Sequence, residues 1–159
     1  MELVGRLAPD LDGRAVGCYI PQTRRILLLD RRAFMSIESW FRVPVNEELY
    51  RAAAAHEVAH AVAACNGVPG RLALAAHEYL AYVTMFATMD PGQRERILAR
   101  FPGRGLANSL QIHLLVYLVE PLKFGADSWR HYLRQADRAA WLREVAAGHV
   151  VEQWPSDGP

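Results

Sequence analysis

The stretch Glu48–Asn66, ELYRAAAAHEVAHAVAACN, contains two histidines and a glutamate in the order His56-Glu57-x-x-His60. Residues four apart lie on one face of an α-helix, so His56 and His60 can direct two imidazole nitrogens at one zinc ion. Glu57 reaches the edge of that face, where a carboxylate can act as general base on a water molecule at the metal. The stretch therefore predicts a helix with two metal ligands and a catalytic base.

The residues around this motif favour a helix. Asn46 can cap its amino end, and Glu47 and Glu48 suit the positive end of the helix dipole. Ala52–Ala55 are strong helix formers, and Asn66-Gly67 is a stop signal. The competing interpretation is an ordinary helix with exposed polar side chains among alanines.

Composition limits the class of protein. The chain has 159 residues, of which 52% are hydrophobic, and a formal net charge of +1. This predicts one compact domain over residues 1–150, with a flexible tail over 151–159. Scattered Lys and Arg argue against a nucleic-acid partner, and no apolar run is long enough to predict a membrane span.

Two cysteines, Cys18 and Cys65, are too few for a disulfide framework. They are either two buried thiols or one bridge between an early strand and the end of the motif helix, which would imply an oxidising compartment. The first residues lack the apolar centre of a signal peptide. We therefore expect a cytoplasmic protein if the chain is complete, and an exported or periplasmic one if a signal peptide was removed.

The remaining pattern predicts an α+β fold, in which a small β-hairpin precedes about five helices. After an irregular lead-in over residues 1–14, the hairpin covers Ala15–Leu29, and its second strand, Arg25–Leu29, is apolar enough to be buried on both faces. A short helix ends before Pro44. Later segments predict a turn at Val68–Gly70, helices at Arg71–Met89 and from Asp90 to Arg100, a fully buried helix at Leu106–Val119, chain breaks at Pro121 and Gly125, and a helix at Ser128–Ala147.

A catalytic zinc site needs a third protein ligand. The helix after the motif contains His77-Glu78, and 17 residues separate His60 from Glu78. Neighbouring helical residues point about 100° apart, so only one of His77 and Glu78 reaches the metal easily. The residues also leave His113 and His131, farther along the chain, as possible third ligands.

HEVAH, the following HEYLAY and the preceding GCYIPQTRRILLL together resemble the gluzincin branch of zinc metallopeptidases, including thermolysin-like and minimal single-domain members. The resemblance covers roughly residues 17–90, and Tyr79 and Tyr82 stand where the family has acidic or asparagine-rich sequence. It implies a zincin-like fold with the motif helix at its centre. It also implies that His56, His60 and Glu78 bind Zn²⁺, that Glu57 is the general base, and that Arg25–Leu29 lines the substrate cleft.

Gluzincins stabilise the oxyanion with a Tyr or His from the downstream helical part. By this resemblance the candidates are His113 with Tyr117, four residues apart, or His131 with Tyr132, although each could equally be an ordinary buried side chain. We thus expect a zinc metallopeptidase that acts on a peptide or protein substrate. The alternative is a zincin-like scaffold that binds metal or a partner without catalysis, because the chain has little material for a second lobe.

Overall fold

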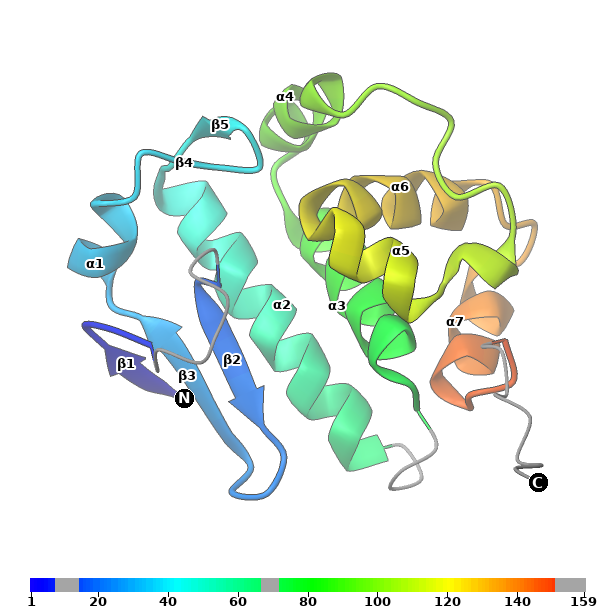
Figure 1. Cartoon of the computed structure of the whole chain (residues 1–159), viewed down its shortest axis with the longest axis horizontal. Helices are drawn as coiled ribbons and strands as arrows, with labels where there is room; N and C mark the ends of the chain where they lie inside the picture. Colours follow the sequence, from blue (N-terminus) through cyan, green and yellow to red (C-terminus); the bar gives the residue numbers. More distant parts are fainter. Residues whose placement is uncertain (8–14, 67–71, 151–159) are drawn as a thin grey trace.

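The computed structural model of the chain describes residues 1–7, 15–66 and 72–150. The predicted turn at Val68–Gly70, the predicted tail at 151–159 and residues 8–14 of the predicted lead-in lie outside these residues. The described part is α+β, as expected: a small sheet and the short helix over residues 31–35 lie on one side of a long central helix, and the later helices lie on its opposite side (Figure 1).

The predicted hairpin is confirmed. It consists of β2 (Gly17–Ile20) and β3 (Arg25–Leu29), which pair antiparallel with Cys18 opposite Leu27. A third strand, β1 (Glu2–Val4), pairs parallel with β3, so the prediction of an irregular lead-in is wrong for these residues. Three residues are too short a run to show strand periodicity in sequence. The order β1-β3-β2 makes β3 the middle strand and β2 an edge strand.

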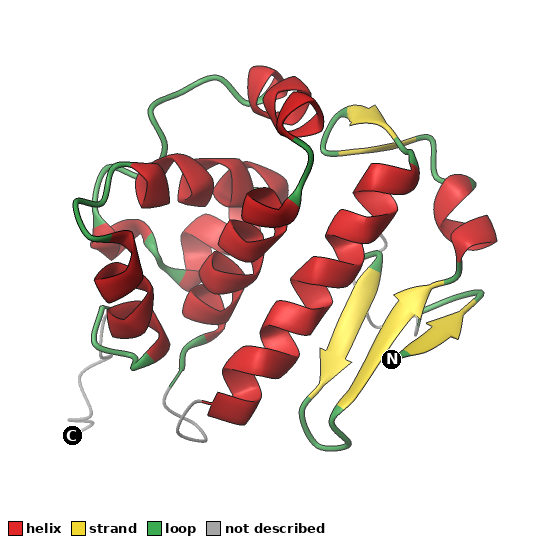
Figure 2. Ribbon diagram, turned by 180° about the vertical axis from the view of Figure 1, so that it is seen from behind, coloured by secondary structure: helices red, strands yellow, loops and turns green. Residues whose placement is uncertain are grey.

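The prediction that Arg25–Leu29 is buried on both faces is also wrong. Only Leu28 is buried in β3, and the other side chains keep part of their surface in water. The reason is that the sheet is small and packs on α2, which separates it from the other large helices (Figure 2).

The segment between the sheet and the motif helix contains a shorter helix than predicted. It forms α1 (Arg31–Met35) and a two-stranded ribbon of β4 (Ser39–Trp40) and β5 (Val43–Pro44). The turn of this ribbon places Phe41 and Arg42 at positive φ angles of 53° and 59°. Phe41 is thereby fully buried, where its ring packs edge-on against Tyr82.

The motif helix is confirmed as α2 (Glu47–Asn66), and the Asn46 side chain accepts a hydrogen bond from the Leu49 amide at 2.9 Å. The next two predicted helices are α3 (Leu74–Thr88) and α4 (Pro91–Arg100). Asp90 caps α4 by accepting from the Gln93 amide at 3.0 Å. Helices α2 and α3 pack side by side over most of their length, which brings their facing side chains together (Figure 1).

The predicted buried helix over Leu106–Val119 is wrong. Its place is taken by a 3-10 turn, η1 (Ser109–Gln111), and the short helix α5 (Leu114–Val119), in which no residue is buried. Glu120 leaves the helical conformation at φ −151°, because it precedes Pro121, the first residue of α6 (Pro121–Leu133). Within the predicted segment only Leu106 and Ile112 are buried, so its continuous hydrophobicity did not indicate burial of the whole run.

The chain break predicted at Gly125 is wrong, since this residue lies in the middle of α6. A Cβ atom there would stand 2.6 Å from Cδ1 of Tyr82, so Gly125 is needed for close packing of α6 on α3. The predicted helix Ser128–Ala147 is divided into α6 and α7 (Arg138–Ala146). Asp137 caps α7 by accepting from the Ala140 amide at 2.8 Å, which favours the break.

Two further expectations concern membranes and disulfides. Within the described ranges, no helix has the length and apolar character needed to cross a bilayer. Cys18 and Cys65 carry no disulfide, and Cys65 is exposed, so neither a bridge nor burial of both thiols is correct.

Candidate metal centre

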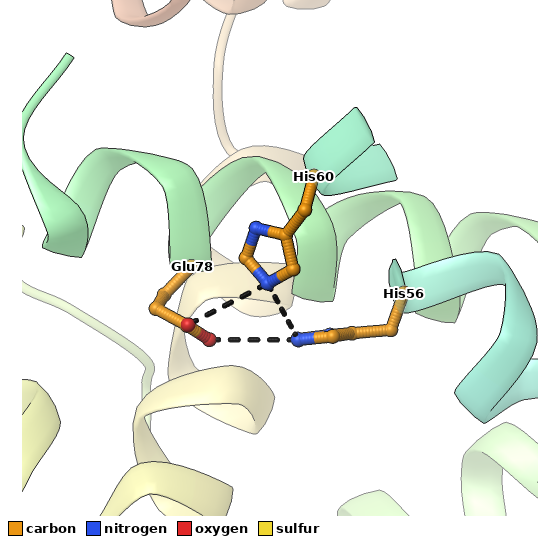
Figure 3. A group of neighbouring side chains, drawn as sticks. All are labelled: His56, His60 and Glu78. Atoms are coloured by element: carbon orange, nitrogen blue, oxygen red, sulfur yellow. Dashed lines mark hydrogen bonds and ion pairs between the residues drawn. The ribbon is translucent and has the colours of Figure 1, made fainter. Parts of the chain in front are cut away.

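Three side chains from two neighbouring helices converge at one point (Figure 3). His56 and His60 lie one turn apart on α2, and Glu78 faces them from α3. The two Nε2 atoms are 3.1 Å apart. Glu78 places Oε2 at 3.5 Å from Nε2 of His56 and Oε1 at 3.5 Å from Nε2 of His60.

These separations suit a metal ion. Donor atoms bound tetrahedrally to one ion at about 2.0–2.2 Å are about 3.3–3.6 Å apart, close to the observed distances. His56 and Glu78 are buried, and His60 is half-buried. Among the residues that the structure describes, this is the one group of three or more His, Cys, Asp and Glu side chains close enough to hold an ion.

Of the four candidates for the third ligand, Glu78 is the one that belongs to the convergent group. His77 points its ring toward the same region, with its centroid 6.1 Å from that of His60, but it does not belong to the convergent group. His113 and His131, the more distant alternatives, do not belong to it either. The helical offset of about 100° between neighbours explains why Glu78 converges and His77 does not.

The three groups influence each other's protonation. Burial disfavours the charged form of His56, but the hydrogen bond and charge of Glu78 outweigh it and raise the pKa of His56. Burial and the charge of His56 lower the pKa of His60 to about 4. Burial would raise the pKa of Glu78, yet hydrogen bonds from His56 and Tyr117 lower it. A carboxylate and an unprotonated imidazole are the forms that bind metal.

Glu57 lies beside this group without belonging to it. Its side chain is buried, and burial raises its pKa to about 7, although the charge of His56 and the backbone amide of Tyr19 act in the opposite direction. Oε2 of Glu57 accepts no hydrogen bond within the described residues. One oxygen is therefore available to take a proton.

The group opens into a cleft of about 900 Å³. One wall is α2, the second is α3 with part of α5 and α6, and the third is the edge strand β2 with Gly17, Cys18 and Tyr19. The expectation that Arg25–Leu29 lines the cleft is wrong: none of its five residues does. Because β1 and β2 pair with the two sides of β3, the strand that faces the cleft is β2.

Of the first pair expected to stabilise an oxyanion, His113 and Tyr117, the structure brings one residue to the site. Tyr117 lines the cleft, and it acts to lower the pKa of Glu78. His113 does not line the cleft; its Nδ1 accepts from the Leu115 amide at 3.1 Å and caps α5. His113 is the N-cap residue of α5, and its carbonyl accepts a hydrogen bond from the Tyr117 amide at 3.1 Å.

The second expected pair, His131 and Tyr132, also lies away from the cleft. His131 is buried, and its Nδ1 is 2.9 Å from the hydroxyl of Tyr79, which in turn accepts from Nε1 of Trp141 at 2.9 Å. This cluster joins α3, α6 and α7 and is structural.

Tyr82 also lines the cleft, four residues after Glu78 on α3, and its ring packs edge-on against His56 with centroids 4.5 Å apart. Two other residues at the site were not predicted. Gly17 and Tyr19 contact Glu57 from β2. Their contact spans about 40 residues of sequence, and no local pattern signals it.

Comparison with known proteins adds one assignment. No curated protein and no solved structure matches the chain. Residues 1–154 match a family whose description is "Family of unknown function (DUF6639)". The match covers nearly the whole chain, and the protein therefore belongs to this family.

Proposed function

We propose that the protein is a zinc-dependent hydrolase of zincin-like fold, and specifically a metallopeptidase of gluzincin type. The observation that carries the proposal is the convergence of His56, His60 and Glu78 beside the carboxylate of Glu57 in an open cleft. Two imidazoles and one carboxylate form a ligand set typical of catalytic zinc, whereas Ca²⁺ and Mg²⁺ prefer oxygen ligands alone.

When bound, zinc supplies a Lewis acid for the substrate carbonyl and makes water more acidic. Glu57 takes a proton from the water that attacks the carbonyl carbon, so that a C–O bond forms. Glu57 then gives this proton to the amide nitrogen, and the C–N bond breaks with release of an amine. Tyr117 lines the same cleft, and its hydroxyl can donate a hydrogen bond to the oxyanion.

The test combines metal analysis with digestion of a peptide library. We expect one zinc ion per chain and cleavage of peptides by the native protein. Glu57→Gln should keep the zinc and lower kcat by about 10²–10⁴-fold, since a general base contributes this much. Glu95→Gln is the matched control, because Glu95 is exposed on α4 and far in sequence from the cleft residues.

Three outcomes would contradict the proposal. Equal cleavage by the Glu57→Gln variant would exclude the mechanism. One zinc ion per chain with no turnover of any substrate would favour a metal-binding or partner-binding scaffold instead. Absence of any zinc affinity would exclude both functions.

A further inference from the structure

The edge strand β2 directs part of its backbone at Glu57. Strand residues alternate in the direction of their backbone groups. The carbonyl of Val16 accepts from the Leu29 amide of β3 at 3.0 Å, so Val16, Cys18 and Ile20 face the neighbouring strand. Gly17 and Tyr19 face the open edge, where the backbone amide of Tyr19 acts to lower the pKa of the nearby Glu57 carboxyl.

The Glu57 side chain occupies the space that a side chain at Gly17 would need. A Cβ atom at Gly17 would be 2.6 Å from Cγ, 2.8 Å from Oε1 and 2.9 Å from Cδ of Glu57. These distances are well below the contact distance of about 3.5 Å between carbon atoms. A side chain as small as that of alanine therefore cannot share this space with Glu57 as it stands.

The glycine is not required by its own backbone conformation. Positive φ angles occur at Gly103, Gly105 and Gly148 among the glycines of the described ranges, but not at Gly17. Alanine is therefore compatible with the strand backbone, and a glycine inside a strand is otherwise a disadvantage. The space that the Glu57 side chain needs therefore explains why position 17 is a glycine.

We propose that Gly17 is a positioning residue for Glu57: its missing side chain admits the Glu57 carboxylate to the edge of β2. This inference rests on the proposed function for its catalytic consequence, but the contact itself does not. The space left at Gly17 sets the position from which the Glu57 carboxylate receives the proton.

The first experiment measures the contact through thermal unfolding of the full chain, without reference to activity. Gly17→Ala is made in the native protein and in the Glu57→Ala background, where the clashing atoms are missing. We expect the melting temperature to fall by about 3 °C or more in the native background, and to stay equal or rise in the Glu57→Ala background. Gly5→Ala is the control, because its Cβ would lie at an ordinary 3.6 Å from Asp30.

A fall of equal size in both backgrounds would overturn the inference, since Gly17 would then serve the strand alone. If Gly17→Ala folds only when Glu57 is also replaced, the inference is supported in its strongest form. Failure to fold in both backgrounds would overturn it.

The second experiment measures zinc affinity and steady-state kinetics of the Gly17→Ala variant. A base displaced by about 1 Å should lower kcat by about 10²-fold, while KM and zinc affinity stay within about threefold. A proportional loss of zinc affinity, or unchanged kcat, would contradict the positioning role. If the native protein has no turnover, the proposed function fails, and the unfolding experiment still decides whether Gly17 positions Glu57.

Discussion

Replacement of Gly125 by alanine tests whether the close packing of α6 on α3 stabilises the candidate metal centre. Gly125 lies in the buried part of α6, directly against the ring of Tyr82 on α3. The same ring packs against His56, with centroids 4.5 Å apart. A side chain at Gly125 therefore displaces the ring that contacts a proposed metal ligand.

The size of the effect follows from the distances. A Cβ at Gly125 would lie 2.6, 2.8 and 2.9 Å from Cδ1, Cγ and Cε1 of Tyr82. Reaching an ordinary contact of about 3.5 Å requires a shift of about 0.9 Å. Overpacking of this kind costs about 1–3 kcal/mol, and the better helix propensity of alanine returns about 1 kcal/mol. We expect a net loss of about 1 kcal/mol, or about 2–4 °C in melting temperature for a chain of this length.

Two measurements check this prediction: urea unfolding of the metal-free protein, and zinc affinity in competition with a chelator. Zinc affinity should fall roughly tenfold, as for other changes beside a metal ligand. In a Tyr82→Leu background the clash is removed, and Gly125→Ala should be neutral or stabilising. The reasoning is refuted if Gly125→Ala alone stabilises the protein and leaves zinc affinity unchanged.

Three further predictions follow from the site and its surroundings. Glu78→Ala should weaken zinc binding by more than about 100-fold, whereas His77→Ala should leave it within about threefold; similar losses in a chelator titration would contradict the ligand assignment. Tyr117→Phe should lower kcat by about 10²-fold at nearly constant KM, and His113→Ala should not; equal kinetics of Tyr117→Phe and native protein would remove Tyr117 from the mechanism. Burial and the charge of Arg134 lower the pKa of His131 in the folded protein, so the unfolded chain binds more protons and stability falls as pH drops below about 6.5. Urea unfolding in the presence of chelator should show that the free energy of unfolding falls less between about pH 7 and 5 for His131→Gln than for the native protein. An equal fall in both proteins would contradict this role of His131.

The sequence predicted the parts of the site that depend on helical geometry. The spacing of His56 and His60, the cap at Asn46 and the stop after Asn66 determine where α2 lies and which face it presents. The same geometry predicted that only one of His77 and Glu78 reaches the metal, His113 and His131 stayed as alternatives, and the resemblance favoured Glu78. These features are local, and local periodicity is what a sequence displays most directly.

The parts that depend on tertiary pairing were not predictable in this way. The three residues of β1 pair with one side of β3 and make it the middle strand. The strand that faces the cleft is therefore β2, and not β3 as predicted. In the same way, the apolar run at Leu114–Val119 was read as buried, because hydrophobicity alone does not tell whether another element covers a helix. The Glu120-Pro121 pair, which ends α5, indicated the local structure better than hydrophobicity did.

Glycine was misread for a related reason. Gly125 resembles a chain break in sequence, but it is a site of close packing against Tyr82. Gly17 likewise has its meaning only through Glu57, about 40 residues away. In both cases the absence of a side chain matters because of a distant neighbour.

The central claim is that His56, His60 and Glu78 together bind zinc, and a zinc-edge anomalous diffraction map of crystals grown with stoichiometric zinc tests it most directly. We predict one peak, about 2.0–2.2 Å from Nε2 of each histidine and from an oxygen of Glu78. No peak at this position, or a peak whose third protein ligand is His77 or another side chain, would contradict the account.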